Sequence, residues 1–313
     1  MIDLDINFFD LYMLKEFKTF DDFKKLFKTE LKCIKYLIDL RFKGVLTCPR
    51  CGCNKCYKLK QQGLFKCSAC NKPFTMKVGT IFEDSALPLT KWFEAFYWEV
   101  ITVKGVSSHQ LAKHLGITQK TAWFMLQRIR WALANNTIEK MKGDIQIDET
   151  YVGGKEINKH KNKKMPLSQG GNHKMSVLGI LQTGGKVAMQ YIRKSNINNI
   201  KPVLARYVDL ENSILNTDES PLYKGYKRNV VNHSKKQYKN GSATTNGIES
   251  VFSHFKRMVL GVFMHISRKH INVYLNAFSF RFNTRELSSF DKFNSAMGLM
   301  FSKRLMYVDL INN

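Results

Sequence analysis

The fold is decided by a strand-like stretch in the middle of the chain, Gly143-Asp-Ile-Gln-Ile-Asp-Glu-Thr-Tyr-Val-Gly-Gly154. Ile145 and Ile147 alternate with polar residues, which is the period of a half-buried strand. Asp148 then points away from the face that the two isoleucines bury, on the same side as Gln146. The stretch therefore predicts a strand that carries a functional carboxylate on its second face.

Two further carboxylates follow at other predicted elements. The run Ser213-Ile-Leu-Asn-Thr-Asp218 predicts a second buried strand whose carboxyl end carries Asp218. Glu249 lies in a helical pattern, and Lys256 shares its face because seven residues make about two turns. The apolar stripe of this predicted helix consists of Ile248, Val251, Phe252, Phe255 and Val259.

Each carboxylate also has a purely structural interpretation. Asp148 could be a surface charge at a strand end, and Asp218 could belong to a turn. Glu249 could complete a capping box with Asn246 as the N-cap residue. Taken together, on two strands and a helix of a basic chain, the three acids instead fit a hard-cation site. Two Mg²⁺ or Mn²⁺ ions bound by oxygen ligands can activate a nucleophile and stabilise a leaving oxygen in phosphoryl transfer.

Six of the seven cysteines are clustered between residues 48 and 70. Cys48-Pro-Arg-Cys51 and Cys67-Ser-Ala-Cys70 are two C-x-x-C knuckles at the interval of a zinc ribbon. Their four thiolates would satisfy one tetrahedral Zn²⁺ in a structural site. Cys53-Asn-Lys-Cys56 is an alternative first pair, but the proline and Gly52 beside the first knuckle favour Cys48 and Cys51. Reduced, buried thiols would have no reason to recur at this spacing.

Residues 105–130 have the pattern of two short helices joined by a turn. Ser107 or Ser108 caps the first helix, and Gly116 ends it with a residue that tolerates the left-handed conformation. Thr118 caps the second helix. This pattern is typical of a helix-turn-helix, although a helical hairpin packed on the main domain would share it. The buried stripe expected for the second helix is Ala122, Met125, Leu126 and Ile129. The residues expected to face DNA are Gln119, Lys120 and Arg128.

The charge of the chain favours a polyanionic partner. Fifty Lys and Arg residues against 25 Asp and Glu residues give a formal net charge of +25. Such an excess binds nucleic acid through the release of counterions, although a solvated basic surface would have the same composition. The hydrophobic content of 44% is that of a folded protein. No apolar run is long enough to span a bilayer, so we expect an intracellular protein without membrane contact.

The full series of motifs resembles one family. In order, the motifs are Cys67-Ser-Ala-Cys70, Val78-Gly-Thr-Ile-Phe-Glu-Asp-Ser85, Leu87-Pro-Leu-Thr-Lys-Trp92, Thr121-Ala-Trp-Phe-Met125, Ile147-Asp-Glu-Thr-Tyr-Val-Gly-Gly154, Thr217-Asp-Glu-Ser220, His233-Ser-Lys-Lys-Gln-Tyr238, and Asn246-Gly-Ile-Glu249 with Lys256-Arg257. Beyond residue 45, the chain resembles Merlin-type DDE transposases and their relatives encoded by bacterial insertion sequences. Several short motifs in a fixed order are far more specific than any one of them.

The resemblance implies an RNase H-like catalytic fold with Asp148, Asp218 and Glu249 as its acidic triad. Lys256 matches the basic residue that often follows the last acid, and Arg257 adds a second DNA contact. Because some relatives have an asparagine as the third member, Asn246 is a candidate beside Glu249. Two positions depart from the pattern: Thr244-Thr245-Asn246 replaces a common His-Thr-Asn triplet, and Phe252 replaces a tryptophan.

We therefore expect an α/β protein with an RNase H-like mixed-sheet catalytic domain, preceded by a small zinc ribbon and a helical helix-turn-helix region. The expected segments are an N-terminal helical segment at 1–46, the ribbon at 47–86, the helix-turn-helix region at 87–140, the catalytic domain at 141–290 and a C-terminal tail at 291–313. Phe17, Phe20, Phe23, Leu26 and Phe27 recur at helical spacing in the first segment and are expected to pack in a core.

The expected function is that of a DNA transposase that binds terminal inverted repeats and catalyses strand cleavage and transfer. Its expected cofactors are structural Zn²⁺ and catalytic Mg²⁺ or Mn²⁺. Its expected partners are double-stranded DNA, at the element ends and the target, and further copies of the chain in a homodimer or larger assembly on DNA. It would act in the cytoplasm and nucleoid of a bacterium or in the nucleus of a eukaryote. The alternatives are a DNA-binding regulator and a domesticated, inactive transposase.

Overall fold

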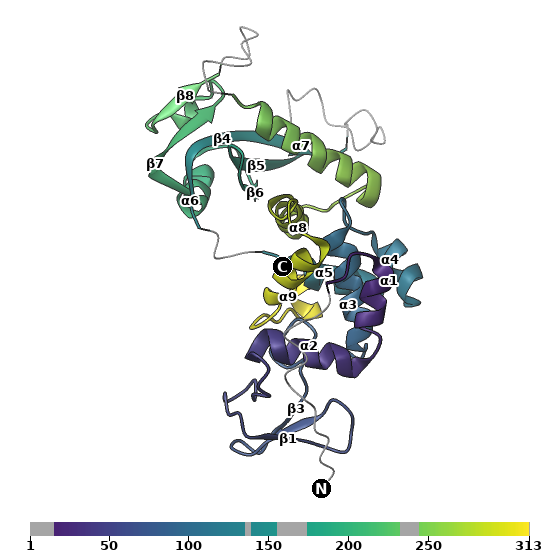
Figure 1. Cartoon of the computed structure of the whole chain (residues 1–313). Coiled ribbons are helices and arrows are strands. Elements are labelled where there is room, and N and C mark those ends of the chain that lie inside the picture. Colours follow the sequence, from purple (N-terminus) through teal and green to yellow (C-terminus); the bar gives the residue numbers. More distant parts are fainter. Residues whose placement is uncertain (1–15, 135–138, 155–173, 232–243, 313) are drawn as a thin grey trace. The chain divides into compact units, whose positions relative to one another are not determined.

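The computed structural model describes residues 16–134, 139–154, 174–231 and 244–312. The chain divides into two compact units (Figure 1). The first unit comprises residues 1–133 and 286–313, and the second comprises residues 134–285. The described parts of the chain contain no helix that is long and apolar enough to cross a membrane.

Aromatic side chains build the core of the first unit. Helix α1 (Phe20–Leu26) begins with a capping box between Thr19 and Asp22, and α2 (Glu30–Phe42) begins after Thr29. Both helices pack with α3 (Leu89–Ile101) and α9 (Ser289–Gly298), and neighbouring ring centroids lie 4.7 to 5.9 Å apart. The rings at the centre of this core are Phe17, Phe23, Phe27, Tyr36, Phe93, Tyr97 and Phe293. The predicted packing role is confirmed for Phe17, Phe23 and Phe27, which are buried.

Three short strands carry the cysteine-rich region. They are β1 (Cys56–Lys58), β2 (Phe65–Cys67) and β3 (Pro73–Phe74), which form an antiparallel sheet in that order. Cys56 pairs with Cys67 across the first hairpin. Phe65 of β2 and Phe74 of β3 are buried and stack on one another. This ring pair is the apolar contact between the two strands.

Two further helices follow the predicted capping pattern. Helix α4 (Ser108–Leu115) begins after Ser107 and ends at Gly116, whose φ of 59° is left-handed. Helix α5 (Gln119–Ala132) begins after Thr118, which accepts a hydrogen bond from a backbone N–H of the first turn. The predicted buried stripe of α5 is confirmed, since Ala122, Met125, Leu126 and Ile129 are all buried. A buried ion pair of 2.9 Å between Glu99 on α3 and Arg130 on α5 ties the helices together.

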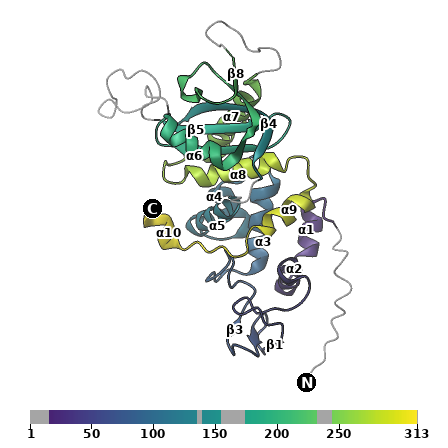
Figure 2. The same cartoon turned by 90° about the vertical axis from the view of Figure 1, so that its left-hand side faces the viewer.

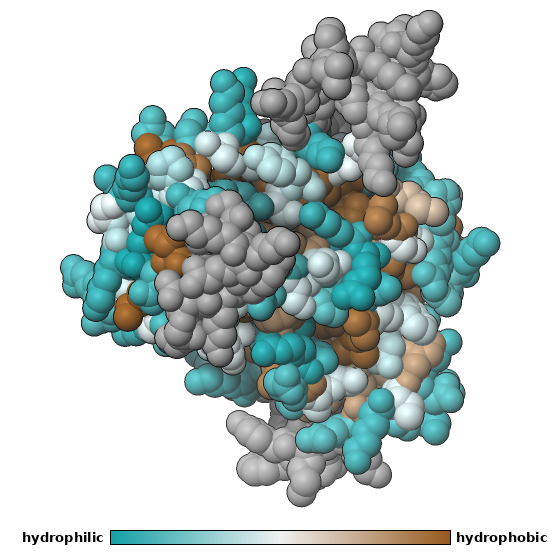
Figure 3. All heavy atoms as spheres, turned by 90° about the horizontal axis from the view of Figure 1, so that it is seen from above, coloured by the Kyte–Doolittle hydropathy of each residue, from teal (hydrophilic) through white to brown (hydrophobic). Residues whose placement is uncertain are grey.

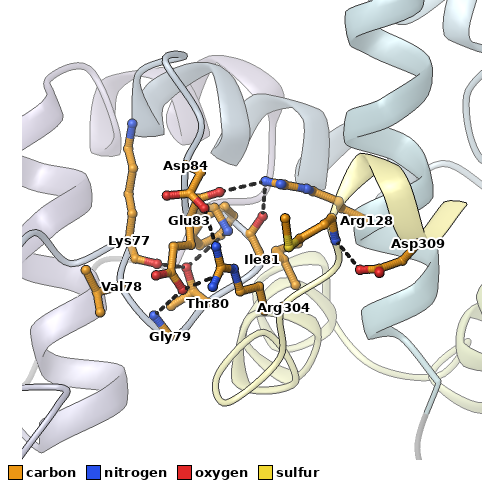
Figure 4. A network of polar contacts seen from close by, with 12 residues as sticks. Lys77, Val78, Gly79, Thr80, Ile81, Glu83, Asp84, Arg128, Arg304 and Asp309 are labelled. Atoms are coloured by element: carbon orange, nitrogen blue, oxygen red, sulfur yellow. Dashed lines mark hydrogen bonds and ion pairs between the residues drawn. The ribbon is translucent and has the colours of Figure 1, made fainter.

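The C-terminal segment is part of the first unit. Beside α9 it contains α10 (Tyr307–Asn312), although a tail was expected here. Arg304 forms an ion pair of 2.6 Å with Asp84 (Figure 4). The backbone N–H of Ser302 donates to the carbonyl of Gly79. Lys303 donates to the last turn of α5 through the carbonyl of Ala132. The loop at 78–85, one of the sequence motifs, is therefore held by residues more than 200 positions away.

The second unit is a mixed sheet with helices on both faces. Its strands are β4 (Met141–Val152), β5 (Met175–Gln182), β6 (Val187–Ile192), β7 (Val208–Thr217) and β8 (Arg228–Val230). The spatial order is β6-β5-β4-β7-β8. The first three strands are antiparallel neighbours, whereas β4, β7 and β8 are parallel. This arrangement is the expected RNase H-like mixed sheet.

Separate apolar clusters cover the two faces of this sheet. Helix α6 (Ile197–Tyr207) packs on the face that buries Ile145 and Ile147. Helices α7 (Asn246–Met258) and α8 (Ile271–Asn283) pack on the other face, with Val177 and Leu181. Figure 2 shows α6 in front of the sheet and α7 behind it. The alternation read from the sequence is thus confirmed, and it directs Asp148 toward the face of α7.

Candidate catalytic and metal sites

Four cysteine sulfurs gather at the ribbon. The Sγ atoms of Cys48, Cys51, Cys67 and Cys70 all lie within 4.8 Å of one another. The Sγ atoms of Cys48 and Cys70 are 3.9 Å apart, and those of Cys51 and Cys67 are 3.6 Å apart. A tetrahedron of thiolates at about 2.3 Å from Zn²⁺ has edges of about 3.8 Å. The donor set and its spacing therefore fit one structural Zn²⁺.

The second pair of cysteines lies outside this cluster. The Cys56 thiol donates to the carbonyl of Cys53, and the Cys53 sulfur accepts from the backbone N–H of Lys55. Within the cluster, the backbone N–H of Cys70 lowers the pKa of Cys67 to about 6. A thiol with a lowered pKa is a ready metal ligand, because zinc binds the thiolate. The geometry thus favours Cys48 and Cys51 over the alternative first pair.

Asp148 is the central acid of the second unit. It lies on the middle strand β4 opposite Gly179 of β5, and its side chain is half-buried. Burial, together with the negative charges of Glu149, Asp218 and Glu249, raises its pKa to about 7. Asp218 and Glu249 are thus close enough to Asp148 for their charges to act on it. A site that concentrates negative charge in this way favours a divalent cation.

Asp218 follows the last residue of β7, the parallel neighbour of β4. Its Oδ1 accepts a hydrogen bond of 3.0 Å from the backbone N–H of Ser220. This bond fixes the carboxylate at the carboxyl end of the strand, as the sequence predicted. Asp218 and Asp148 lie on neighbouring strands, which explains their electrostatic interaction.

A fourth acid beside the site was not singled out from the sequence. Glu149 accepts a hydrogen bond from the hydroxyl of Tyr223, a fully buried residue of the short helix η4 (Pro221–Tyr223). Burial raises the pKa of Glu149, and the charge of Asp218 adds to this effect. The position of Glu149 directly after Asp148 could have drawn attention to it in the sequence. Because side chains alternate along a strand, the Glu149 side chain lies on the opposite face of β4, where it contacts Tyr223.

The first turn of α7 is docked on β4 by Gln146. The Gln146 side chain is buried, and its Oε1 accepts a hydrogen bond of 3.0 Å from the backbone N–H of Ile248. The N-cap residue of α7 is Thr245, whose side chain makes no capping bond to the backbone. Gln146, two residues before Asp148, therefore takes over the capping role from a different element. It fixes the residue next to Glu249 at the strand that carries the central acid.

Glycines at two positions permit this close packing. A Cβ on Gly179 would lie 2.5 Å from Cε1 of Phe252, and a Cβ on Gly247 would lie 2.7 Å from Oε1 of Gln146. A larger residue at either position would force the side chains of α7 or of Gln146 to shift. Phe252, at the position where the resemblance led us to expect a tryptophan, lies where a side chain at position 179 would otherwise be.

Glu249 and Asn246 differ in their surroundings. The Thr245 hydroxyl donates to Oε1 of Glu249 at 3.3 Å, and Glu249 contributes to the raised pKa of Asp148. Asn246 is exposed and is the first residue of the helix, so the capping box that would have Asn246 as its N-cap is not formed. Within the described residues, only the four cysteines form a group of at least three donors that could hold an ion as they stand. The three acids interact at longer range.

The residues expected to face DNA fall into two groups. Gln119 and Lys120 are exposed on α5, and Lys256 and Arg257 are exposed on α7. Arg128 differs from the expectation, because it is only 6% exposed. Its guanidinium donates to the carbonyls of Ile81 and Glu83 at 2.8 and 2.9 Å (Figure 4). The helical pattern placed Arg128 outside the apolar stripe, but the loop at 78–85 covers that side of α5.

Comparison with known proteins finds two domains in this chain, a zinc ribbon followed by a transposase domain. A model of the transposase zinc-ribbon domain matches residues 28–73, and a model of the ISXO2-like transposase domain matches residues 140–283. The chain is also similar to a protein in the transposable element ISH50 of Halobacterium salinarum, with 26% identity over 275 residues. That match covers 82% of this chain and 92% of the relative.

The fold and the matched domains define a transposase with an N-terminal zinc ribbon and a DDE domain. The chain belongs to the IS1595 family of transposases, whose zinc-ribbon and transposase domains match in sequence order. One motif of the resemblance, His233–Tyr238, lies outside the described residues.

Proposed function

We propose that this transposase binds the terminal inverted repeats of a mobile element and catalyses metal-dependent DNA cleavage and strand transfer. The observation that carries the proposal is that the charges of Asp218 and Glu249 both act on Asp148, the partly buried acid of the central strand. These charges disfavour ionisation of Asp148 when no metal is bound, and a divalent cation would relieve the repulsion.

The three acids would hold Mg²⁺ or Mn²⁺ through their carboxylate oxygens, which are the ligands that hard cations prefer. Bound ions would supply activation of a water or 3′-hydroxyl and stabilisation of the leaving oxygen. Within the chain, β4 and β7 fix two acids on parallel neighbours, and Gln146 holds the helix of the third. Lys256 and Arg257, exposed further along α7, would hold DNA phosphates near this site.

Recognition of the repeats is proposed for residues 47–134. The ribbon, with one Zn²⁺ on Cys48, Cys51, Cys67 and Cys70, would brace this region. The helices α4 and α5 would act as a helix-turn-helix that offers Gln119 and Lys120 to DNA. Joining two ends calls for two active sites, so we propose a homodimer or larger assembly on DNA. The protein would act wherever the host keeps its DNA.

The test is strand cleavage in vitro on duplexes that carry the element's own ends, with Mg²⁺ or Mn²⁺ and with EDTA. The proposal expects nicking and joining that require the ion, and their loss in Asp148→Ala and Asp218→Ala with end binding nearly unchanged. Specific binding without cleavage under any metal would instead identify a regulator or an inactive, domesticated copy. Cleavage by Asp148→Ala at the wild-type rate would remove the assigned active site.

A further inference from the structure

The exposed face of α7, which carries Lys256, continues beyond the helix to residues that the proposed function does not use. A π-helical turn at Val259–Phe263 follows α7 directly. Leu260 follows Glu249 by three helical turns, which is about 16 Å, so it lies on the same face as Glu249 and Lys256. All three side chains are exposed. The face thus begins with an acid of the active site and ends with a leucine in solvent.

Two large apolar side chains are exposed at this turn. Leu260 is 68% exposed and Met264 is 79% exposed. Met264 has φ 60° and ψ −48°, and its backbone N–H donates to the carbonyl of Val259 at 2.7 Å. A non-glycine residue at positive φ is strained, and π-helical turns concentrate at functional sites. The backbone at Met264 is therefore strained at the point where its side chain is presented to solvent.

The surroundings of these two residues are basic. Between Thr244 and Arg285 the sequence has six Lys or Arg residues and one acid, Glu249 itself. Four of the six are exposed in the segment that holds the π-turn: Lys256, Arg257, Arg268 and Lys269. In the view of Figure 3, hydrophilic residues cover much of the visible surface and hydrophobic residues occupy smaller patches between them. An apolar pair within a basic segment is complementary to duplex DNA, which combines a charged backbone with apolar sugars and bases.

We propose that the surface formed by Lys256, Leu260, Met264, Arg268 and Lys269 binds the DNA end, with Leu260 and Met264 as a wedge against a base step. Exposed Leu and Met side chains can unstack a base step in this way, while flanking cations hold the phosphates. The inference rests on the proposed cleavage function. At about 3.4 Å per base pair, the wedge meets the duplex about five base pairs from the phosphate at Glu249.

The first experiment measures binding of a terminal-repeat duplex to the full-length protein over a range of salt concentrations. Leu260→Ser with Met264→Ser should weaken binding about tenfold and leave the salt dependence unchanged, because no charge is lost. Arg268→Ala should instead reduce the slope of log affinity against log salt by about one. The matched control is Ile197→Ser, an exposed apolar residue at the start of α6, which should bind like wild type.

The second experiment detects the wedge itself. A duplex with 2-aminopurine about five base pairs from the cleavage site should gain fluorescence with wild type, because the unstacked base is no longer quenched. The double variant should not cause this gain. The probe placed about ten base pairs away should stay dark with both proteins.

Three results separate the failures. If wild type neither binds nor cleaves the end, the proposed function itself falls, and the wedge with it. If the wild type cleaves DNA, and the double variant binds the duplex as tightly as the wild type and causes the same gain in fluorescence, only the wedge is overturned. If DNA-free wild type sediments as a dimer and the double variant as a monomer, a second copy covers the two side chains and the wedge is again overturned.

Discussion

The two proposed metal sites of this transposase are built in opposite ways. The four cysteines lie between residues 48 and 70, on two knuckles joined by a short hairpin. The three acids are Asp148 on β4, Asp218 directly after β7, and Glu249 on α7. The first site needs only local turns, whereas the second needs a complete sheet and a docked helix. The carboxylate site should therefore respond to changes that touch no metal ligand, and the cysteine site should not.

The largest effect is expected within the carboxylate site. Glu249→Ala should lower the rate of end cleavage about a thousandfold or more, because it removes the acid that α7 contributes beside Asp148. Asn246→Ala, three residues earlier and exposed, should cleave within a few fold of wild type. Single-turnover cleavage with both variants decides the third position. A dead Asn246→Ala together with an active Glu249→Ala would give the role to Asn246.

At the cysteine site, substitution of a proposed zinc ligand should remove zinc, whereas substitution of a neighbouring cysteine should not. Purified protein should contain about one equivalent of zinc by elemental analysis, and Cys67→Ser should lose it. Because a ribbon folds with its ion, end binding should weaken about a hundredfold, with the second unit still folded. Cys53→Ser is the matched control, since this thiol lies outside the cluster, and it should keep both zinc and binding. Zinc retained by Cys67→Ser and lost by Cys53→Ser would reverse the assignment.

Gln146→Leu tests whether the carboxylate site depends on the docking of α7, because the substitution changes no proposed metal ligand. The variant leaves the N–H of Ile248 buried without an acceptor, which costs about 1–3 kcal/mol and frees the start of α7. Mn²⁺ affinity and the cleavage rate should each fall about tenfold, while end binding is kept. Gln146→Glu retains an acceptor oxygen for the N–H of Ile248 and should keep most of the Mn²⁺ affinity and of the cleavage rate. Gln182→Leu, on the neighbouring strand, removes a hydrogen bond to Lys142 instead and should leave Mn²⁺ affinity unchanged.

The smallest effect concerns pH. Burial raises the pKa of Asp148 from 3.8 to about 7, so the metal-free site is protonated below that value. Metal binding must then release the proton, and Mn²⁺ affinity should weaken about twofold at pH 7 and about tenfold at pH 6. The same shift means that the metal-free fold loses stability as the pH rises from about 4 to 7.

Calorimetric titration of Mn²⁺ in two buffers that differ in ionisation enthalpy measures the released proton directly. Asp148→Asn is the control and should release none. Equal affinity at pH 6 and pH 8 in the wild type would contradict the raised pKa of Asp148.

Local patterns were sufficient for much of this structure. The C-x-x-C spacing, together with the proline and Gly52 beside the first knuckle, favoured the four cysteines whose sulfurs gather, since each knuckle is formed by four consecutive residues. Ser107 and Gly116 marked the two ends of α4, and Thr118 marked the start of α5, because caps are formed within one turn. The alternation at Ile145 and Ile147 placed Asp148 on the correct face of β4, because side-chain direction in a strand has a period of two.

Tertiary structure decided what lies against those faces. Periodicity could not show that the loop at 78–85 buries Arg128, or that Tyr223 meets Glu149 from a later strand connection. Nor could it show that Gln146 caps a helix that starts 100 residues later, which only the glycines at 179 and 247 permit. Sequence spacing determines direction along one element, but contact between distant elements depends on which surfaces pack most closely.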